Sequence, residues 1–204
     1  MLIAFAGLPS AGKSTTAKAL ADRLGVRWFV EPEEDQWPEA VRDRDRVGRF
    51  TALTWFRSVR VPKLYAAAQA SRSEHAAVID SYYDVLLSRY IGEDPFSWLL
   101  DPGDPYFPLA RHMAELDWQL LPHADFLVFL RLDERVWNTF MNRRARDFDR
   151  AAHLKEQFAM QALMEHACRQ AEVEHGTRLI VIDQEDSTPA ATAVRVAAFL
   201  PSIV

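Results

Sequence analysis

The sequence predicts an α/β fold in which a five-stranded parallel sheet lies between layers of helices, a three-layer α/β/α arrangement. Short apolar runs recur along the chain, and longer stretches with helical spacing separate them. Several runs are continuous rather than alternating, which is typical of strands that are covered on both faces. Each run is an expected strand, and the five runs are residues 2–6, 26–30, 76–80, 126–132 and 178–183.

The first helical stretch follows the first apolar run. Ala17, Leu20 and Leu24 have the i, i+3, i+7 spacing of an amphipathic helix. Gly25 stands where a left-handed C-cap would end that helix. The same spacing predicts further helices over residues 47–72, 82–91, 109–121, 133–145, 151–175 and 188–199.

The least regular stretch is GEDPFSWLLDPGDPYFP, residues 92–108, whose Pro and Gly content predicts a loop or a pair of turns. It either lines a substrate cleft or connects two helices, and we expect the connector. In a parallel sheet, ligands bind at the carboxyl ends of the strands. We therefore expect a site just past Ala6, Val30, Asp80 and Leu132.

The composition narrows the classes of partner. With 204 residues, 49% apolar and 26% charged, the chain fits one globular domain over residues 1–204. A net charge of −5 gives no general attraction to nucleic acid or anionic membranes, so neither is expected as a partner. No apolar run reaches the ~18 residues of a membrane span. The lone cysteine, Cys168, excludes an internal disulfide and a zinc cluster, which favours a reducing cytoplasm.

The stretch GLPSAGKS, residues 7–14, matches the phosphate-binding pattern G-x-x-x-x-G-K-[ST] between a strand and a helix. Its glycines let backbone N–H groups turn toward phosphates, and the helix N-terminus adds positive potential. Lys13 is expected to contact the β- and γ-phosphates, and Ser14 to ligate Mg²⁺. We therefore predict a P-loop NTPase that binds ATP and Mg²⁺ through Gly7, Ser10, Ala11, Gly12, Lys13, Ser14 and Thr15.

Because motors, GTPases and kinases all carry P-loops, other motifs are needed to distinguish these classes of protein. The chain has no Asn/Thr-Lys-x-Asp segment for reading guanine and lacks the length of most remodelling ATPases, which leaves a small-molecule kinase. Glu31 follows the second expected strand, where a carboxylate is placed to accept the proton of an attacking hydroxyl. The alternative is a solvated acidic loop, because Glu33, Glu34 and Asp35 follow at once.

Glu31-Pro32 followed by Trp37 resembles the motif of the deoxynucleoside kinase family, relatives of thymidylate kinase. The resemblance implies that Glu31 is the catalytic base and that Trp37 lines a nucleoside pocket. It extends along most of the chain. The matching stretches are the long substrate-side helix (49–64), the third strand and its helix (78–91), the fourth strand with its helix and arginine lid (121–146), the helix after the lid (153–168) and the last strand with its adenine loop (178–186).

The resemblance places the arginine lid in NRRARDFDR, residues 142–150. Arg144 and Arg146 match the family's lid arginines, and Arg143 is expected to be solvated. Arginines on a closing segment stabilise the charge of a transferring phosphoryl group. The alternative is an ordinary basic helix end, which the helix dipole favours.

The third expected strand departs from the family's pattern. Asp80-Ser81-Tyr82 stands where the family has Glu-Arg-Ser, or Asp-Arg followed by an aromatic residue. Asp80 is still suited to hold Mg²⁺ through water. Ser81 cannot replace the arginine, because a hydroxyl supplies neither its charge nor its planar fork. The candidate replacements are Arg57, Arg60 and Arg89, of which Arg57 is the expected substrate contact.

The acceptor is less defined than the phosphate donor. The family's base-reading glutamine is expected near the start of the long helix, where this chain has Arg49 and Phe50. Trp37, Trp55, Phe56 and Tyr82 are the candidates to stack on a planar acceptor, and Trp37 has the strongest claim because it follows Glu31 at family-like spacing. The expected acceptor is a (deoxy)nucleoside. The alternative acceptors are a nucleoside monophosphate, an antibiotic or another metabolite. The alternative to kinase activity is a non-catalytic ATP-binding regulatory role. Because family members are often homodimers, the apolar face of 109–121 is a candidate dimer surface.

Overall fold

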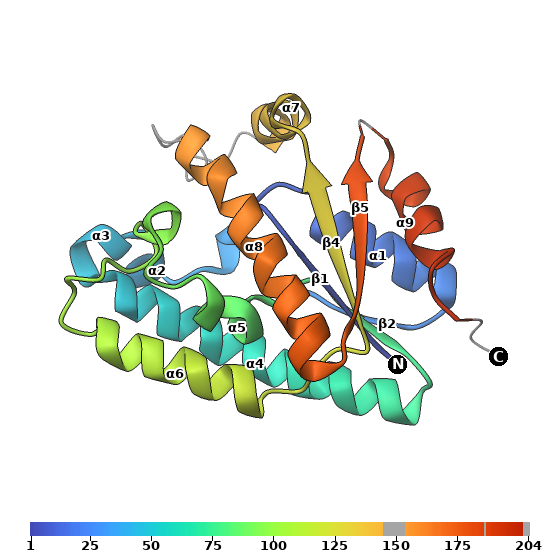
Figure 1. Cartoon of the computed structure of the whole chain (residues 1–204), viewed down its shortest axis with the longest axis horizontal. Coiled ribbons are helices and arrows are strands. Elements are labelled where there is room, and N and C mark those ends of the chain that lie inside the picture. The colour runs from blue at the N-terminus through green and yellow to red at the C-terminus, as the bar shows by residue number, and fades with distance from the viewer. Residues whose placement is uncertain (145–153, 186, 202–204) are drawn as a thin grey trace.

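The computed structural model describes the backbone of residues 1–144, 154–185 and 187–201. In these residues five parallel strands form one sheet in the order β2-β3-β1-β4-β5. Figure 1 shows β4 and β5 side by side in this sheet. The expected α/β fold and all five predicted strands are therefore confirmed. The strands are β1 (Leu2–Gly7), β2 (Arg27–Phe29), β3 (Ala77–Ile79), β4 (Phe126–Leu132) and β5 (Arg178–Gln184).

The central strand β1 lies between β3 and β4, with Ala4 opposite Ile79 on one side and Leu127 on the other. Every residue of β1 is buried, and β4 is buried except for the half-buried Arg131. This burial explains why both strands read as continuous apolar runs in the sequence. The outer strand β2 is shorter and more exposed.

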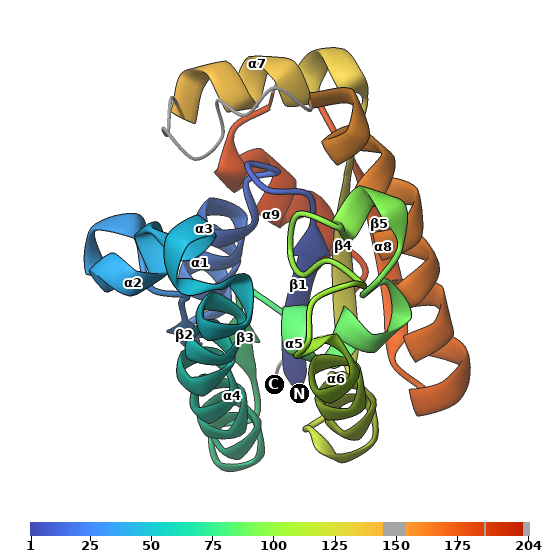
Figure 2. The ribbon, with the colours of Figure 1, turned by 90° about the vertical axis from the view of Figure 1, so that its left-hand side faces the viewer.

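Helices cover both faces of the sheet. The longer helices are α1 (Lys13–Leu24), α4 (Arg49–Ser73), α6 (Phe107–Leu120), α7 (Glu134–Arg144), α8 (Leu154–His175) and α9 (Pro189–Ala197). Helices α1 and α9 pack against each other on one face, and α4 and α8 lie on the opposite face, with α6 beyond them (Figures 1 and 2). The predicted three-layer arrangement is confirmed.

Shorter helices fill the connections. They are α2 (Glu39–Arg42), α3 (Arg44–Val47), α5 (Tyr83–Leu86) and the 3₁₀ helices η1 (Glu34–Gln36), η2 (Leu87–Arg89) and η3 (Asp94–Phe96). The single helix predicted over 82–91 is wrong, because this stretch divides into α5 and η2. Gly25 ends α1 with a φ of 66°, as predicted. In the described part of the chain, none of the helices has the length and apolar content that a bilayer span requires.

The carboxyl ends of β1, β2 and β3 meet at one edge of the sheet. Gly7 ends β1, Glu31 follows β2, and Asp80 follows β3. The backbone N–H of Glu31 donates to the Asp80 carboxylate at 3.0 Å, which ties the second and third strand ends together. The fold thus brings Gly7, Glu31 and Asp80, three of the sequence-predicted site residues, to one edge of the sheet.

Candidate active site

The phosphate-binding loop turns sharply between β1 and α1. Gly12 caps α1 in the left-handed conformation with a φ of 79°, and Ser10 also has a positive φ of 62°. The N–H of Ala11 donates back to the carbonyl of Leu8 at 3.2 Å, which closes the turn. A loop with left-handed residues ahead of a helix N-terminus is suited to bind an anion such as phosphate.

Gly7 allows the loop to leave the sheet beside β4. Its φ is 139°, and a Cβ there would lie 2.8 Å from the backbone carbonyl oxygen of Leu130. We expect Gly7→Ala to lower the free energy of unfolding by about 2–4 kcal/mol, because it adds backbone strain and a clash with a fixed atom. Gly25→Ala is the control, since its added Cβ meets open space. Thermal unfolding of both variants measures the difference, and equal losses would contradict the close-approach explanation.

Lys13 and Ser14 begin α1 and face different partners. The Lys13 ammonium donates to the carbonyl oxygens of Gly7 at 3.0 Å and Leu8 at 2.9 Å, so it lies across the loop mouth. The Ser14 hydroxyl is hydrogen-bonded to the Asp80 carboxylate. Thr15 instead donates back to the carbonyl of Gly12 at 3.0 Å. The first two side chains are therefore placed for a phosphate and for a metal ion, respectively.

Asp80 is buried with 1% of its surface exposed. Its Oδ1 accepts the Glu31 N–H, whereas its buried Oδ2 has no hydrogen-bond partner among the described residues. Burial and the negative charge of Glu31 raise the pKa of Asp80 to about 6, although the Ser14 hydrogen bond opposes them. A nearby cation would stabilise the ionised form of such a carboxylate. Asp80 and Ser14 therefore fit a Mg²⁺ site.

Protein ligands alone do not form a complete metal site here. The described residues contain no cluster of three or more His, Cys, Asp or Glu side chains that could hold a metal. Mg²⁺ often keeps several waters and binds through few protein groups together with substrate phosphates. The pair Ser14 and Asp80 matches that mode of binding, because the loop beside it is shaped for phosphate.

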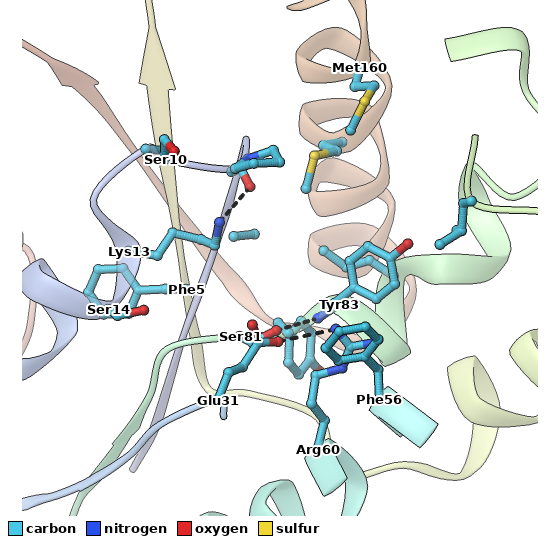
Figure 3. Close-up of a pocket in the computed structure, with 18 of the residues that line it drawn as sticks. Phe5, Ser10, Lys13, Ser14, Glu31, Phe56, Arg60, Ser81, Tyr83 and Met160 are labelled. Atoms are coloured by element: carbon cyan, nitrogen blue, oxygen red, sulfur yellow. Dashed lines mark hydrogen bonds and ion pairs between the residues drawn. The ribbon is translucent and has the colours of Figure 1, made fainter. Parts of the chain in front are cut away.

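A cavity of about 490 Å³ joins the phosphate-binding loop to the ends of β2 and β3 (Figure 3). Lys13 and Ser14 line one side, and Glu31, Arg60 and Ser81 line the other. The remaining wall is mostly apolar and aromatic. It includes Trp37, Ala52, Leu53, Phe56, Tyr83, Leu86, Trp98, Leu99, Phe140, Met160 and Met164. Because the loop and the apolar wall share this cavity, a phosphate donor and an acceptor can meet in it.

Glu31 lies in this cavity with its carboxylate toward Arg60 and Ser81, as Figure 3 shows. The Arg60 Nη1 is 3.2 Å from Glu31 Oε1. Burial alone would raise the pKa of Glu31, but the charges of Arg60 and Lys13 and a hydrogen bond with Ser81 lower the pKa below its usual value. Glu31 is therefore an ionised carboxylate at neutral pH, which is the form that a proton acceptor needs.

Two of the predicted stacking residues have different surroundings. Trp37 lines the cavity, with its indole N–H donated to the Pro32 carbonyl at 3.1 Å and its ring edge-to-face with Phe56 at 5.0 Å. Tyr82 touches the cavity but is only 2% exposed, and its hydroxyl accepts the Ala124 N–H at 3.0 Å. Tyr82 is thus mainly a core residue rather than the expected stacking surface.

The prediction of Arg57 as a substrate contact disagrees with its placement. The Arg57 guanidinium forms two hydrogen bonds of 2.6 Å with Asp117 of α6, and Arg57 is not among the described residues that line the cavity. Arg89 also lies elsewhere, over the Trp118 ring. Of the three candidate arginines, Arg60 is the one that lines the cavity. The acidic partner on α6 draws Arg57 away from the site.

The segment 92–108 connects η2 with α6, as expected, but it also lines the cavity through Trp98 and Leu99. Arg49, the first residue of α4, donates to the Trp98 carbonyl and holds this segment beside the helix. The expectation of a mere connector is therefore wrong. The same contact shows what the arginine does at the position where a base-reading glutamine was expected.

The predicted lid falls largely outside the described residues. Arg144 is the last residue of α7, and its side chain is not described. Arg146 and the rest of 145–150 also lie outside the described residues. Their lid role therefore stays a prediction.

Sequence reasoning missed two residues that support the phosphate-binding loop. The Trp137 indole of α7 donates to the Pro9 carbonyl at 3.0 Å, and the Gln184 side-chain amide of β5 donates to the Ala11 carbonyl at 3.2 Å. Thr192 of α9 donates to Gln184 at 2.9 Å and fixes its orientation. These contacts hold the Pro9 and Ala11 carbonyls in place and so support the shape of the loop.

We expect Trp137→Phe to weaken nucleotide binding several-fold, because removing the indole N–H leaves the Pro9 carbonyl without this donor. A smaller phenyl ring replaces the fully buried indole, so the free energy of unfolding should also fall, by about 1–3 kcal/mol. Trp118→Phe is the control, since its indole donates to Glu174, away from the loop. Calorimetric titration with ATP compares the two variants. Equal affinity in both would contradict a supporting role for Trp137.

A family model described as an AAA domain matches residues 2–186. The chain belongs to this AAA domain family. The match covers the phosphate-binding loop, all five strands and the ends of β2 and β3 that form the cavity. A comparison with curated protein sequences found no match.

Solved structures share the fold of this AAA domain. Deoxyadenosine kinase from M. mycoides with bound dATP superposes with a TM-score of 0.69 at 14% identity, over 97% of this chain and 100% of that chain. The same kinase with the products dCMP and a flexible dCDP gives 0.67 at 14% identity, over 97% of both chains. With bound dCTP it gives 0.63 at 14% identity, over 98% and 100%. The expected deoxynucleoside kinase-like P-loop fold is therefore confirmed.

Proposed function

We propose that the protein transfers the γ-phosphoryl group of ATP, in the presence of Mg²⁺, to a hydroxyl of a small molecule, most simply a (deoxy)nucleoside. One observation carries the proposal: the cavity joins the phosphate-binding loop to the ionised Glu31 carboxylate at the end of β2. A nucleotide-binding module without transfer has no need of a proton acceptor facing its phosphates. The chain would act as one kinase domain in the cytoplasm.

The residues divide the chemistry among them. ATP with Mg²⁺, when bound, supplies the phosphoryl group and part of the neutralising charge. Loop N–H groups and Lys13 bind the phosphates, while Ser14 and Asp80 hold the metal. Glu31 takes the proton of the acceptor hydroxyl, which leaves the oxygen free to form its bond to phosphorus. We assign to Arg144 and Arg146 the stabilisation of the negative charge that develops during phosphoryl transfer.

The acceptor side favours a planar ring that carries a hydroxyl group. Trp37 and Phe56 present aromatic surfaces, and Met160 adds a polarizable side chain from α8. The bound dATP, dCTP and dCMP in the M. mycoides kinase support a nucleoside-type acceptor. The cavity face of α4 is apolar at Ala52 and Leu53, which favours, as a second candidate, an acceptor read by shape, such as an antibiotic or another metabolite.

The test is a coupled assay of ADP release with Mg²⁺ and ATP. The panel contains deoxy- and ribonucleosides, nucleoside monophosphates, hydroxylated metabolites and antibiotics. Acceptor-dependent ADP release with a nucleoside supports the proposal, and release with another class identifies the second candidate. ATP binding without release across the panel would reject kinase activity in favour of a non-catalytic nucleotide-binding role.

We also propose that two copies pair through α6. Leu109, Leu116 and Leu120 are exposed, and with the half-buried Met113 they form one stripe at helical spacing. Two identical stripes related by a two-fold axis are self-complementary. Light scattering is expected to give the mass of a dimer for the native chain and of a monomer for Leu116→Glu. A native monomer at micromolar concentration would refute the pairing.

A further inference from the structure

Arg60 of α4 has every nitrogen of its guanidinium engaged in an ordered contact. Its Nε and Nη2 donate to the two carboxylate oxygens of Asp84 at 2.9 and 3.3 Å. Its Nη1 donates to Glu31 at 3.2 Å. The side chains of Arg60 and Asp84 are 13% and 6% exposed, so this network is shielded from bulk water. Because Asp84 holds one edge of the planar guanidinium, the direction of the remaining donor, Nη1, is fixed.

Two aromatic rings hold the same guanidinium. The Arg60 Cζ lies 4.5 Å from the Tyr83 ring centroid and 5.2 Å from that of Phe56. Both rings line the cavity, and Figure 3 shows them beside Arg60. Cation–π contacts of this kind add to the hydrogen bonds and resist rotation of the side chain. Asp84 thus binds one edge of the Arg60 guanidinium, and the two rings lie close to it.

Ser81, the residue after Asp80, supplies no positive charge beside the Glu31 carboxylate. Ser81 is hydrogen-bonded to Glu31, but its hydroxyl is neutral. The positive charge beside Glu31 therefore comes from the middle of α4, more than twenty residues earlier in the chain. The half-buried Glu31 and the buried Asp84 need a cation between them, because two negative charges at close range repel strongly.

We propose that Arg60 is a positioning residue for phosphoryl transfer, fixed by Asp84 so that it holds the Glu31 carboxylate toward the acceptor hydroxyl. This inference rests on the proposed function. Arg60 acts through Glu31, because the hydrogen bond from Nη1 engages Oε1, and the carboxylate, which also accepts from Ser81, keeps further lone pairs for the acceptor hydroxyl. The network also explains how the chain does without an arginine at position 81.

The chain provides a matched control one turn away. Arg57 lies on the same helix and forms an equally bidentate ion pair, with Asp117, outside the cavity. Arg57→Gln and Arg60→Gln therefore remove comparable ion pairs from α4. We expect similar losses of thermal stability from the two variants, so any difference in catalysis reports the link to Glu31.

Steady-state kinetics test the inference. The acceptor is the compound that the coupled assay with the panel identifies. We expect Arg60→Gln to lower kcat about a hundredfold with the KM for ATP unchanged within twofold. Arg60→Lys should restore less than a tenth of the lost rate, because an ammonium lacks the fork. Added guanidinium should partly rescue Arg60→Ala. Arg57→Gln should keep the native kcat, and equal kcat losses at positions 57 and 60 would overturn the inference.

Crystal structures of Arg60→Gln and Arg57→Gln provide a readout that does not depend on turnover. The inference predicts that the Glu31 carboxylate rotates away in Arg60→Gln and stays in place in Arg57→Gln. An unmoved Glu31 in Arg60→Gln overturns the positioning role even if the native enzyme is active. If the native chain transfers no phosphoryl group but Glu31 moves as predicted, the proposed function fails and the positioning contact stands.

Discussion

Glu31→Gln is expected to reduce kcat by about 10²–10⁴-fold while leaving ATP affinity unchanged. The amide keeps the size of the side chain but cannot accept the proton of the acceptor hydroxyl. Because the pKa of Glu31 lies below its usual value, the native carboxylate is ionised at neutral pH, so the substitution removes a functioning base. Coupled ADP release at saturating ATP measures kcat, and calorimetry measures ATP binding.

Asp35→Asn is the control for this prediction. Asp35 belongs to the same acidic stretch, but it is exposed and is not among the described residues that line the cavity. It should keep the native kcat. If Glu31→Gln also kept the native rate, Glu31 would not be the proton acceptor of the reaction.

Lys13→Met is expected to lower kcat/KM for ATP by at least about 10³-fold, which corresponds to about 4 kcal/mol of lost transition-state stabilisation. The ammonium now lies across the loop, 3.0 and 2.9 Å from the carbonyls of Gly7 and Leu8. We expect it to turn to the phosphates when nucleotide binds, where its charge offsets theirs. Turnover measurements give the loss in kcat, and ATP titration gives the loss in ATP affinity.

Lys18→Met tests whether any lysine on α1 has this effect. Lys18 is exposed and forms an ion pair with Asp22 one turn later at 2.7 Å. Such surface pairs contribute on the order of 0.5 kcal/mol to stability, so this variant should bind ATP and turn over normally. Native affinity in Lys13→Met would mean that the loop does not hold the triphosphate in the way proposed.

The sequence predicted the sheet because burial on both faces makes its strands continuous and apolar. It predicted the phosphate-binding loop because glycine, lysine and serine at fixed spacing are required by backbone geometry and charge. The structure of the long connections between the strands was harder to predict from the sequence. Nothing in the order of residues 82–91 marks where α5 gives way to the tighter turn of η2. The cavity wall formed by Trp98 depends on a contact with Arg49, which lies far away in sequence.

Choices between neighbouring residues also needed the structure. Arg57 and Arg60 are three residues apart on one helix, and only their partners, Asp117 and Asp84, decide which guanidinium reaches the cavity. Tyr82 and Tyr83 are adjacent in sequence, but Tyr82 is held in the core by the Ala124 N–H. No local pattern distinguishes the members of such pairs. The contacts that decide them join segments 24 to 60 residues apart.

The supporting contacts of the phosphate-binding loop are the most distant in sequence. Trp137 is separated from Pro9 by 128 residues, and Gln184 from Ala11 by 173. An aromatic residue on α7 and an amide at the end of β5 read as ordinary core and surface positions. Their role arises because the fold brings the ends of β4 and β5 beside the end of β1.

The central claim is that a hydroxyl of a small molecule receives the terminal phosphoryl group of ATP in this cavity. The most direct measurement is mass spectrometry and ³¹P NMR of the products formed from ATP, Mg²⁺ and each nucleoside of the panel. We expect a phosphate monoester that forms one-for-one with ADP in the native protein and is lost in Glu31→Gln. ATP bound and left intact with every acceptor, or ADP formed with free phosphate alone, would contradict it.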